Sequence, residues 1–204
     1  MTATAAQTTT TTRRTMPLVI AILVALLAAA AGAMAAVCFS NVRYYKPDIH
    51  LTYAGLLGGL VAISAAGPAV GSYGAVIIGA VAGVIVPLAT LQIDLILRLD
   101  DPSGNVAVHG VAACWGLLAT PLFAQGLTVA ERGKQLGAHA LAIFALTALA
   151  ALCSLALWMV LKRLTRLRAS AADEFDGLDI AEHDLAAYPD FQQTMIKSYH
   201  LREV

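Results

Sequence analysis

Four long stretches of this chain contain no Asp, Glu, Lys or Arg. They are residues 16–42, 49–93, 102–130 and 135–161. A helix needs about 20 consecutive apolar residues to cross the hydrocarbon core of a bilayer, and the second stretch, which is interrupted by glycines and a proline at 67–74, is long enough for two crossings. We therefore expect an all-α polytopic membrane protein with about five transmembrane helices, near 17–40, 51–67, 74–97, 103–124 and 136–163.

The charged residues divide the chain into segments. Only 13% of the 204 residues are charged, whereas a soluble domain has about 25%. Residues 1–168 contain eleven Lys and Arg against five Asp and Glu, but residues 169–204 contain two against eight. We expect an unstructured Thr- and Ala-rich segment at 1–15, a transmembrane bundle at 16–168 and an acidic tail at 169–204.

No basic cluster is interleaved with aromatic residues, which argues against a nucleic-acid partner.

The distribution of positive charge predicts the orientation in the membrane, because cytosolic loops are enriched in Lys and Arg. If the N-terminus is outside, the inner side has seven such residues and the outer side four, so the tail is cytosolic.

The first apolar run also has an alternative interpretation. It follows Arg13 and Arg14 and reaches Ala33-Met34-Ala35, which resembles a signal cleavage site. Its length of about 23 residues exceeds a usual signal core and favours an anchor.

His109 is the strongest candidate for a functional side chain. It lies in the uncharged part of the segment DDPSGNVAVHGV, residues 100–111. An ionisable side chain at membrane depth is costly and usually faces a bundle interior or a solute path, although a hydrogen bond to a neighbouring helix is an equal alternative here. Asp100, Asp101 and Pro102 are interpreted as a helix start, with Asp101 as cap and Pro102 at the first helical position. That start would place His109 two turns in, roughly 12 Å from the cytosolic end.

Motifs for catalysis or metal binding are absent from the sequence. There is no HExxH pair, no Walker loop and no GxSxG elbow. Cys38, Cys114 and Cys153 lie in apolar stretches without the paired spacing of metal ligands. We therefore expect neither an enzyme nor a bound metal or cofactor.

Several motifs together resemble the ammonium transporter family, which includes the Amt, Mep and Rh proteins. They are KPDI at 46–49, GLVAIS at 59–64, AVIIGAVAGV at 75–84, DDPSGNVAVHGV at 100–111, GLDIAEH at 177–183 and AYPDF at 187–191. The resemblance runs from about residue 20 to the C-terminus and covers only the second half of the family pattern. It corresponds to helices seven to eleven of eleven, which is half of an inverted repeat plus a final long helix.

The resemblance also implies a site and partners. His109 matches one of the family's two pore histidines, and the tail motif contains Gly177, Leu178, Asp179, His183 and Tyr188. The family pattern implies a trimer in the cytoplasmic (inner) membrane with one pore per subunit. It also implies a cytosolic tail that couples subunits and can contact a PII-type signalling protein.

The implied activity is transport of ammonium or ammonia. Desolvation in an apolar pore lowers the pKa of ammonium and favours neutral ammonia, and paired imidazoles can pass a proton. Because half an inverted repeat lacks the face that completes the site, we expect transport to require partner subunits. The chain could complement a separately encoded first half, join full-length relatives as a non-conducting regulatory subunit through its tail, or be an inactive fragment.

Overall fold

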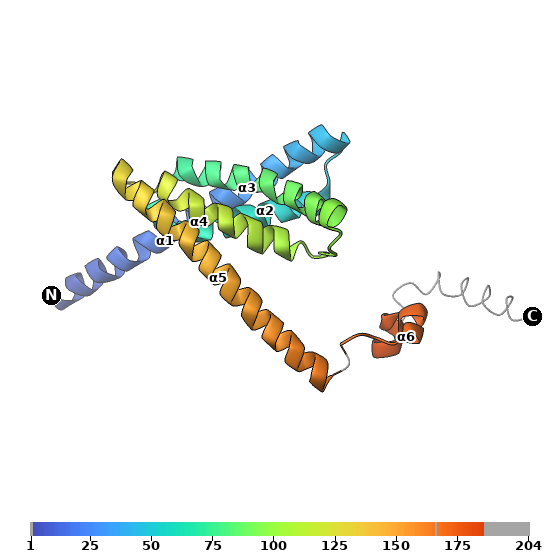
Figure 1. Cartoon of the computed structure of the whole chain (residues 1–204). Coiled ribbons are helices and arrows are strands. Elements are labelled where there is room, and N and C mark those ends of the chain that lie inside the picture. The colour runs from blue at the N-terminus through green and yellow to red at the C-terminus, as the bar shows by residue number, and fades with distance from the viewer. Residues whose placement is uncertain (1, 166, 186–204) are drawn as a thin grey trace, which may run out of the picture. The chain divides into compact units, whose positions relative to one another are not determined.

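The computed structural model describes residues 2–165 and 167–185, and most of these residues form helices (Figure 1). Within this part of the chain, the extended backbone pairing is an isolated antiparallel bridge between Val70 and Ala124. Contacts divide the chain into two compact units, Met1–Thr147 and Ala148–Val204. Four helical segments of the described residues are long and apolar enough to cross a membrane, which confirms the all-α membrane fold: Leu18–Tyr44, Ser72–Leu97, Val106–Phe123 and Val129–Leu164.

The first helix, α1, extends from Thr2 to Tyr44. This start differs from the expectation that residues 1–15 are unstructured. Extending an existing helix adds one hydrogen bond per residue, whereas nucleation is the unfavourable step, so the apolar span can carry the helix into its polar N-terminal flank. Tyr45 ends the helix with φ 59°, in the left-handed region.

The second helix, α2, covers Ile49–Ser64 and begins at a well-defined cap, where an Asp48 side-chain oxygen accepts a hydrogen bond from the Leu51 N–H at 2.9 Å. Its 16 residues span about 24 Å, less than the roughly 30 Å hydrocarbon core. Of the five expected spans, α2 is the one that is not among the four segments long enough to count as a membrane-crossing helix. A 3-10 turn, η1, follows at Gly67–Ala69.

The third helix, α3, covers Ser72–Gln92 and continues as a π-helical segment, η2, over Ile93–Leu97. Arg98 ends this element with φ 52°. A second π-helical segment, η3, covers Val106–Val111 and leads directly into α4, Ala112–Phe123. The expected helices at 74–97 and 103–124 therefore each contain one α-helical and one π-helical part.

The long helix α5 extends from Val129 to Leu164, and none of its residues is buried within the described part of the chain. It begins earlier than the expected start at 136 because of a reciprocal cap. The Thr128 N–H donates to Glu131 Oε2 at 2.8 Å, and the Glu131 N–H donates to Thr128 Oγ1 at 3.4 Å. A Thr followed three residues later by Glu is the sequence signature of such a capping box.

Close packing of α1, α2 and α3 forms the core of the first unit. A side chain at Gly79 would place its Cβ 2.1 Å from the Ala28 carbonyl oxygen, and one at Gly83 would lie 2.1 Å from the Gly32 carbonyl oxygen. Glycines four residues apart share a helix face, and here that face of α3 touches the backbone of α1. Such close approach favours helix association in lipid, where apolar burial provides little driving force.

The second unit contains two short helices, α6 at Ala171–Asp176 and α7 at Leu178–His183. A capping box between Ser170 and Asp173 starts α6. Arg168 donates to Glu174 through Nε at 3.0 Å and NH2 at 3.3 Å. Gly177, with φ +98°, separates the two helices.

Candidate functional site

His109 lies on η3, on the side of this element that faces away from the core. Its neighbours Ala107 and Val108 are buried in a cluster with Ala54, Val86 and Ala112, among others. His109 itself is exposed, together with Gly110. Because adjacent positions on a helix point in different directions, anchoring Ala107 and Val108 in the core leaves the imidazole at the surface.

The start of η3 is determined by Asp101. Its two carboxylate oxygens accept hydrogen bonds from the N–H groups of Asn105 and Val106, each at 2.9 Å. A turn precedes the helix, in which the Gly104 N–H donates to the Asp101 carbonyl and Gly104 has φ +67°. Glycine adopts this conformation at little steric cost.

This turn changes two details that were expected from the sequence. Pro102 lies in the turn and not at the first helical position, because the conformation of Gly104 delays the helix until Asn105. His109 therefore lies in the first turn of its helix and not two turns in. The helix start thus consists of Asp101, Gly104 and Asn105, with Asp100 and Pro102 before it.

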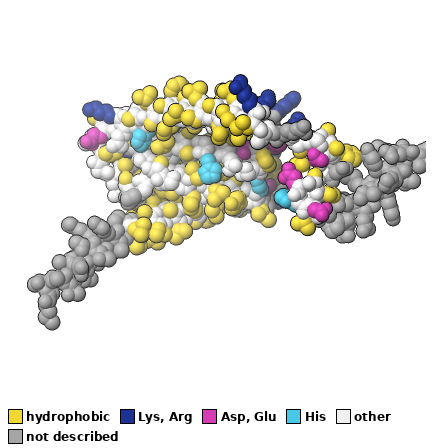
Figure 2. Space-filling model, turned by 90° about the horizontal axis from the view of Figure 1, so that it is seen from below, with side chains coloured by type: hydrophobic (Ala, Val, Ile, Leu, Met, Phe, Trp, Pro, Cys, Tyr) yellow, Lys and Arg dark blue, Asp and Glu magenta, His cyan; other side chains and the backbone are white. Residues whose placement is uncertain are grey.

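Within the part of the chain that the structure describes, no hydrogen bond is made to the imidazole of His109. Figure 2 shows histidine side chains on the visible face of the protein, some of them among hydrophobic and other uncharged side chains and others beside acidic or basic ones. A neutral imidazole has one N–H donor and one nitrogen acceptor. His109 is therefore able to accept a hydrogen bond from, or donate one to, a small polar solute.

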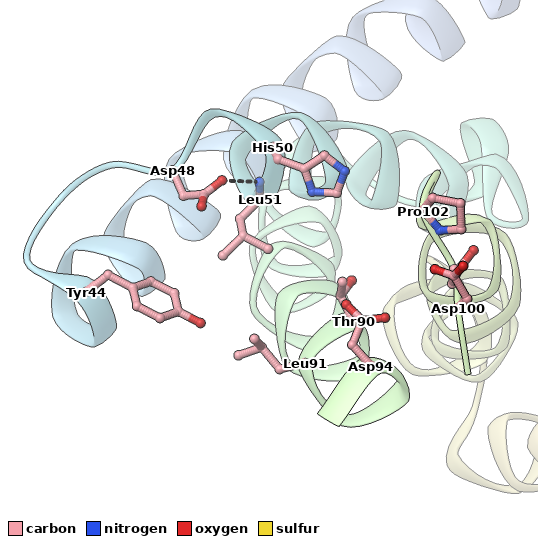
Figure 3. Close-up of a pocket in the computed structure, with 10 residues that line it drawn as sticks. Tyr44, Asp48, His50, Leu51, Thr90, Leu91, Asp94, Asp100 and Pro102 are labelled. Carbon is pink, nitrogen blue, oxygen red and sulfur yellow. Dashed lines mark hydrogen bonds between the residues drawn. The ribbon is translucent and has the colours of Figure 1, made fainter. Parts of the chain in front are cut away.

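A cavity of about 260 Å³ lies at the ends of several helices of the first unit. It is surrounded by His50 of α2, Thr90 of α3, Asp94 of η2 and Asp100 (Figure 3). The other lining residues are Tyr44, Asp48, Leu51, Leu91, Asp101 and Pro102. His109 is not among them, so this cavity and the exposed histidine are separate features.

Carboxylates give the cavity its chemical character. Asp94 and Asp100 come from segments at opposite ends of the loop that joins η2 to η3, while the Asp48 carboxylate caps α2. The sequence pattern predicts only a helix start at Asp100 and Asp101 and not their place in a cavity. The available signal was that Asp48, Asp94 and Asp100 all flank apolar stretches on the same side of the predicted bundle. Among the described residues, no group of three or more His, Cys, Asp or Glu side chains is arranged to hold a metal ion.

The tail residues identified from the sequence lie mainly around α7. Leu178, Asp179 and His183 belong to this helix, and Gly177 precedes it. The Asp179 carboxylate occupies the space beside Gly177, where a Cβ would lie 2.6 Å from Asp179 Oδ1. Tyr188, also predicted to belong to the tail motif, lies outside the described residues.

This chain is a polytopic α-helical membrane protein, because four of its described helices are long and apolar enough to cross a bilayer. One of these helices carries an exposed imidazole. Residues 2–188 of the chain match the family model described as the Ammonium Transporter Family. The chain therefore belongs to the ammonium transporter family, as its motifs predicted.

Curated relatives agree with this assignment. The chain is 36% identical over 173 residues to ammonium transporter Amt2 of Archaeoglobus fulgidus, covering 78% of this chain and 37% of that protein. It is 37% identical over 163 residues to ammonium transporter Amt1 of Haloferax mediterranei, covering 78% of this chain and 30% of that protein. The chain thus spans about a third of the length of these relatives.

Solved structures show the same relationship in three dimensions. A chain described as a sensor Amt protein has a TM-score of 0.76 at 31% identity, covering 82% of this chain and 42% of its own length. The Saccharomyces cerevisiae Mep2 structure has a TM-score of 0.67 at 27% identity, covering 77% of this chain and 38% of its own length. The helices described here therefore have the arrangement found in part of an Amt or Mep fold.

Proposed function

We propose that this chain forms one wall of a permeation pathway for ammonium, with His109 lining that pathway. The observation that carries the proposal is the exposure of His109 on an otherwise apolar membrane helix, without a hydrogen-bond partner among the described residues. An ionisable side chain directed at lipid is costly, so an imidazole at such a position is expected to face protein or a solute-filled space.

The opposite wall of the pathway comes from polypeptide outside these 204 residues. The chain aligns with only 37% of the A. fulgidus relative and 30% of the H. mediterranei relative. In inverted-repeat transporters the site forms where two repeats meet. Transport accordingly requires a segment that covers the His109 face of η3, and we include in the proposal a trimeric assembly with copies of this chain or with full-length relatives.

The chemistry follows from the surroundings of the imidazole. Loss of hydration lowers the pKa of an ammonium ion, because burial disfavours the charged form. Ammonia released in this way is neutral and can pass an apolar segment. An imidazole in its neutral form has one donor and one acceptor, so His109 can hold the solute or relay the proton that ammonium loses.

Uptake of radiolabelled methylammonium into liposomes tests this proposal. The chain is reconstituted alone and together with the first six helices of a relative such as the A. fulgidus Amt2. We expect saturable uptake only in the combined sample, and its loss in His109→Ala. His200→Ala, a histidine substitution in the C-terminal tail, is the matched control and should retain uptake. Equal uptake by the His109→Ala variant would contradict the role of this histidine.

The same samples distinguish transport from the alternative regulatory role. If the chain co-purifies with a full-length relative and lowers the relative's uptake without contributing any of its own, it acts as a non-conducting subunit. In that case the pathway proposal is wrong although the family assignment stands.

The proposal places the chain in the inner membrane with a cytosolic tail that contacts a PII-type protein around α7. Supporting this orientation, seven Lys and Arg residues flank the spans on the proposed inner side and four on the other. A cysteine introduced in place of Ser170, in a variant without the three native cysteines, should react with an impermeant maleimide only after the cells are opened. Labelling of intact cells would overturn the orientation.

A further inference from the structure

Pro121 leaves α4 with a carbonyl that has no donor in its own helix. In an α-helix the N–H of each residue donates to the carbonyl four residues earlier. Proline has no N–H, so the carbonyl of Leu117 loses its usual partner although α4 continues through Pro121 to Phe123. At membrane depth an unpaired backbone carbonyl costs free energy because water is not available to replace the donor.

His139 of α5 supplies the missing donor. Its Nδ1 lies 2.6 Å from the Leu117 carbonyl oxygen. A carbonyl oxygen can only accept a hydrogen bond, so Nδ1 of His139 must carry the proton. The partner comes from 22 residues further along the chain, which makes this bond a contact between two helices and not a local turn.

Arg132 plays a corresponding role two turns earlier on α5. Its NH1 donates to the Pro121 carbonyl at 2.9 Å and also to the Leu122 carbonyl, while NH2 donates to the Ala124 carbonyl at 2.9 Å. The last carbonyls of a helix have no intrahelical donor, and a cation interacts favourably with the negative end of the helix dipole. Arg132 therefore caps the C-terminus of α4.

These polar contacts are important because apolar burial does little to hold α5. No residue of α5 is buried within the described part of the chain. The Leu117 and Pro121 carbonyls of α4, in contrast, accept hydrogen bonds from side chains of α5. We propose that His139 and Arg132 form a polar clamp that supplies the donors missing from α4. The clamp sets the position of the first part of α5 on α4, the helix that continues from η3 and His109. His139 is thus a positioning residue, and this inference is independent of whether the chain transports ammonium.

If His139 replaces the donor that Pro121 lacks, substitutions at these two residues should be energetically coupled. We would compare His139→Leu in the natural chain and in a Pro121→Ala background, measuring unfolding of the full chain in mixed micelles. In the natural chain the substitution should lower the folding equilibrium constant about fivefold, the effect of a typical hydrogen bond. With the N–H restored at position 121, the Leu117 carbonyl has its own helical donor, and the effect should fall below about twofold.

A conservative variant separates the donor from the bulk of the side chain. His139→Asn retains an N–H near the position of Nδ1 and should recover most of the stability lost in His139→Leu. An equal effect of His139→Leu with and without the proline would overturn the inference, because it would show that the imidazole acts through packing alone.

The tautomer of His139 provides a second measurement that does not depend on how well the variants fold. Histidine-specific ¹⁵N labelling of the unmodified chain reports which ring nitrogen carries the proton, and the His139 signals are assigned by their loss in His139→Asn. We expect the tautomer protonated at Nδ1. If His139 is protonated at Nε2 alone, Nδ1 is an acceptor facing another acceptor, and the proposed clamp does not exist.

Discussion

The indole Nε1 of Trp115 donates a hydrogen bond to the backbone carbonyl of Ile78 at 3.0 Å, which joins α4 to α3. Ile78 is fully buried and Trp115 is half-buried against the same cluster of core residues. The helix that follows η3 is therefore attached to the core by a polar contact near the start of α4. The proposed clamp at Arg132 and His139 attaches the opposite part of α4 to α5.

The first prediction concerns this indole. Trp115→Phe keeps an aromatic ring but removes the donor, so we expect the free energy of unfolding to fall by about 1 kcal/mol. Trp115→Ala also removes the packed ring and should cost about 3–5 kcal/mol. Unfolding in mixed micelles, followed by helical circular dichroism, measures both. Equal losses for the two variants would show that the hydrogen bond and not the ring dominates.

The second prediction compares two glycines. Gly83→Ala would force a methyl group to within 2.1 Å of the Gly32 carbonyl oxygen, whereas nothing lies within 4 Å of the corresponding position at Gly137. Because α1 and α3 must separate, Gly83→Ala should lower the free energy of unfolding by about 1–3 kcal/mol. Gly137→Ala should raise it by up to about 1 kcal/mol through helix propensity alone.

The same unfolding assay checks both glycine variants. If Gly83→Ala proved neutral, the close approach of α1 and α3 would not be present in the folded chain. Unchanged or raised stability of the Gly137→Ala control would show that an added methyl group is not harmful in itself.

The third prediction concerns the start of the helix that carries His109. Asp101→Ala removes both acceptors for the N–H groups of Asn105 and Val106. Loss of such a cap costs about 0.5–2 kcal/mol, and the amides of these two residues should exchange with solvent faster. Asp100→Ala, next in the sequence but without a bond to either amide, is the control. Unchanged exchange in Asp101→Ala would contradict the capping role.

The fourth prediction is a pH effect in the tail. The side-chain hydrogen bond from Arg168, reinforced by its positive charge, lowers the pKa of Glu174. A carboxyl group with a lowered pKa stabilises the folded state above its unfolded pKa, and this contribution is lost as the pH falls through the folded value. Arg168→Gln should therefore raise the pKa of Glu174 toward its ordinary value.

A ¹³C titration of the Glu174 carboxyl group measures this change. Arg163→Gln removes a positive charge that is close in the sequence but makes no ion pair with Glu174, and it is the matched control. A pKa of Glu174 that is the same in the Arg168→Gln variant and in the unmodified chain would contradict the ion pair.

Much of the fold could be predicted from the order of residues because lipid restricts the choices. A spanning segment must satisfy its backbone hydrogen bonds internally, so each long uncharged stretch had to be helical. Gly79 and Gly83 are four residues apart, so the sequence alone places them on one helix face, which is the face of α3 that packs closely on α1. The early start of α5 was also encoded, in the Thr128 and Glu131 capping pair, but the apolar pattern alone did not show it.

The sequence alone determined that His109 would be an ionisable side chain in an apolar helix, because its neighbours are uncharged. Only the tertiary structure decided which side of η3 enters the core, since burial of Ala107 and Val108 against α2 and α3 directs His109 outward. The pairing of His139 with Leu117 was decided in the same way. Pro121 predicts a carbonyl without a donor, but which side chain reaches that carbonyl depends on how two helices cross, and the crossing is set by packing over the whole unit.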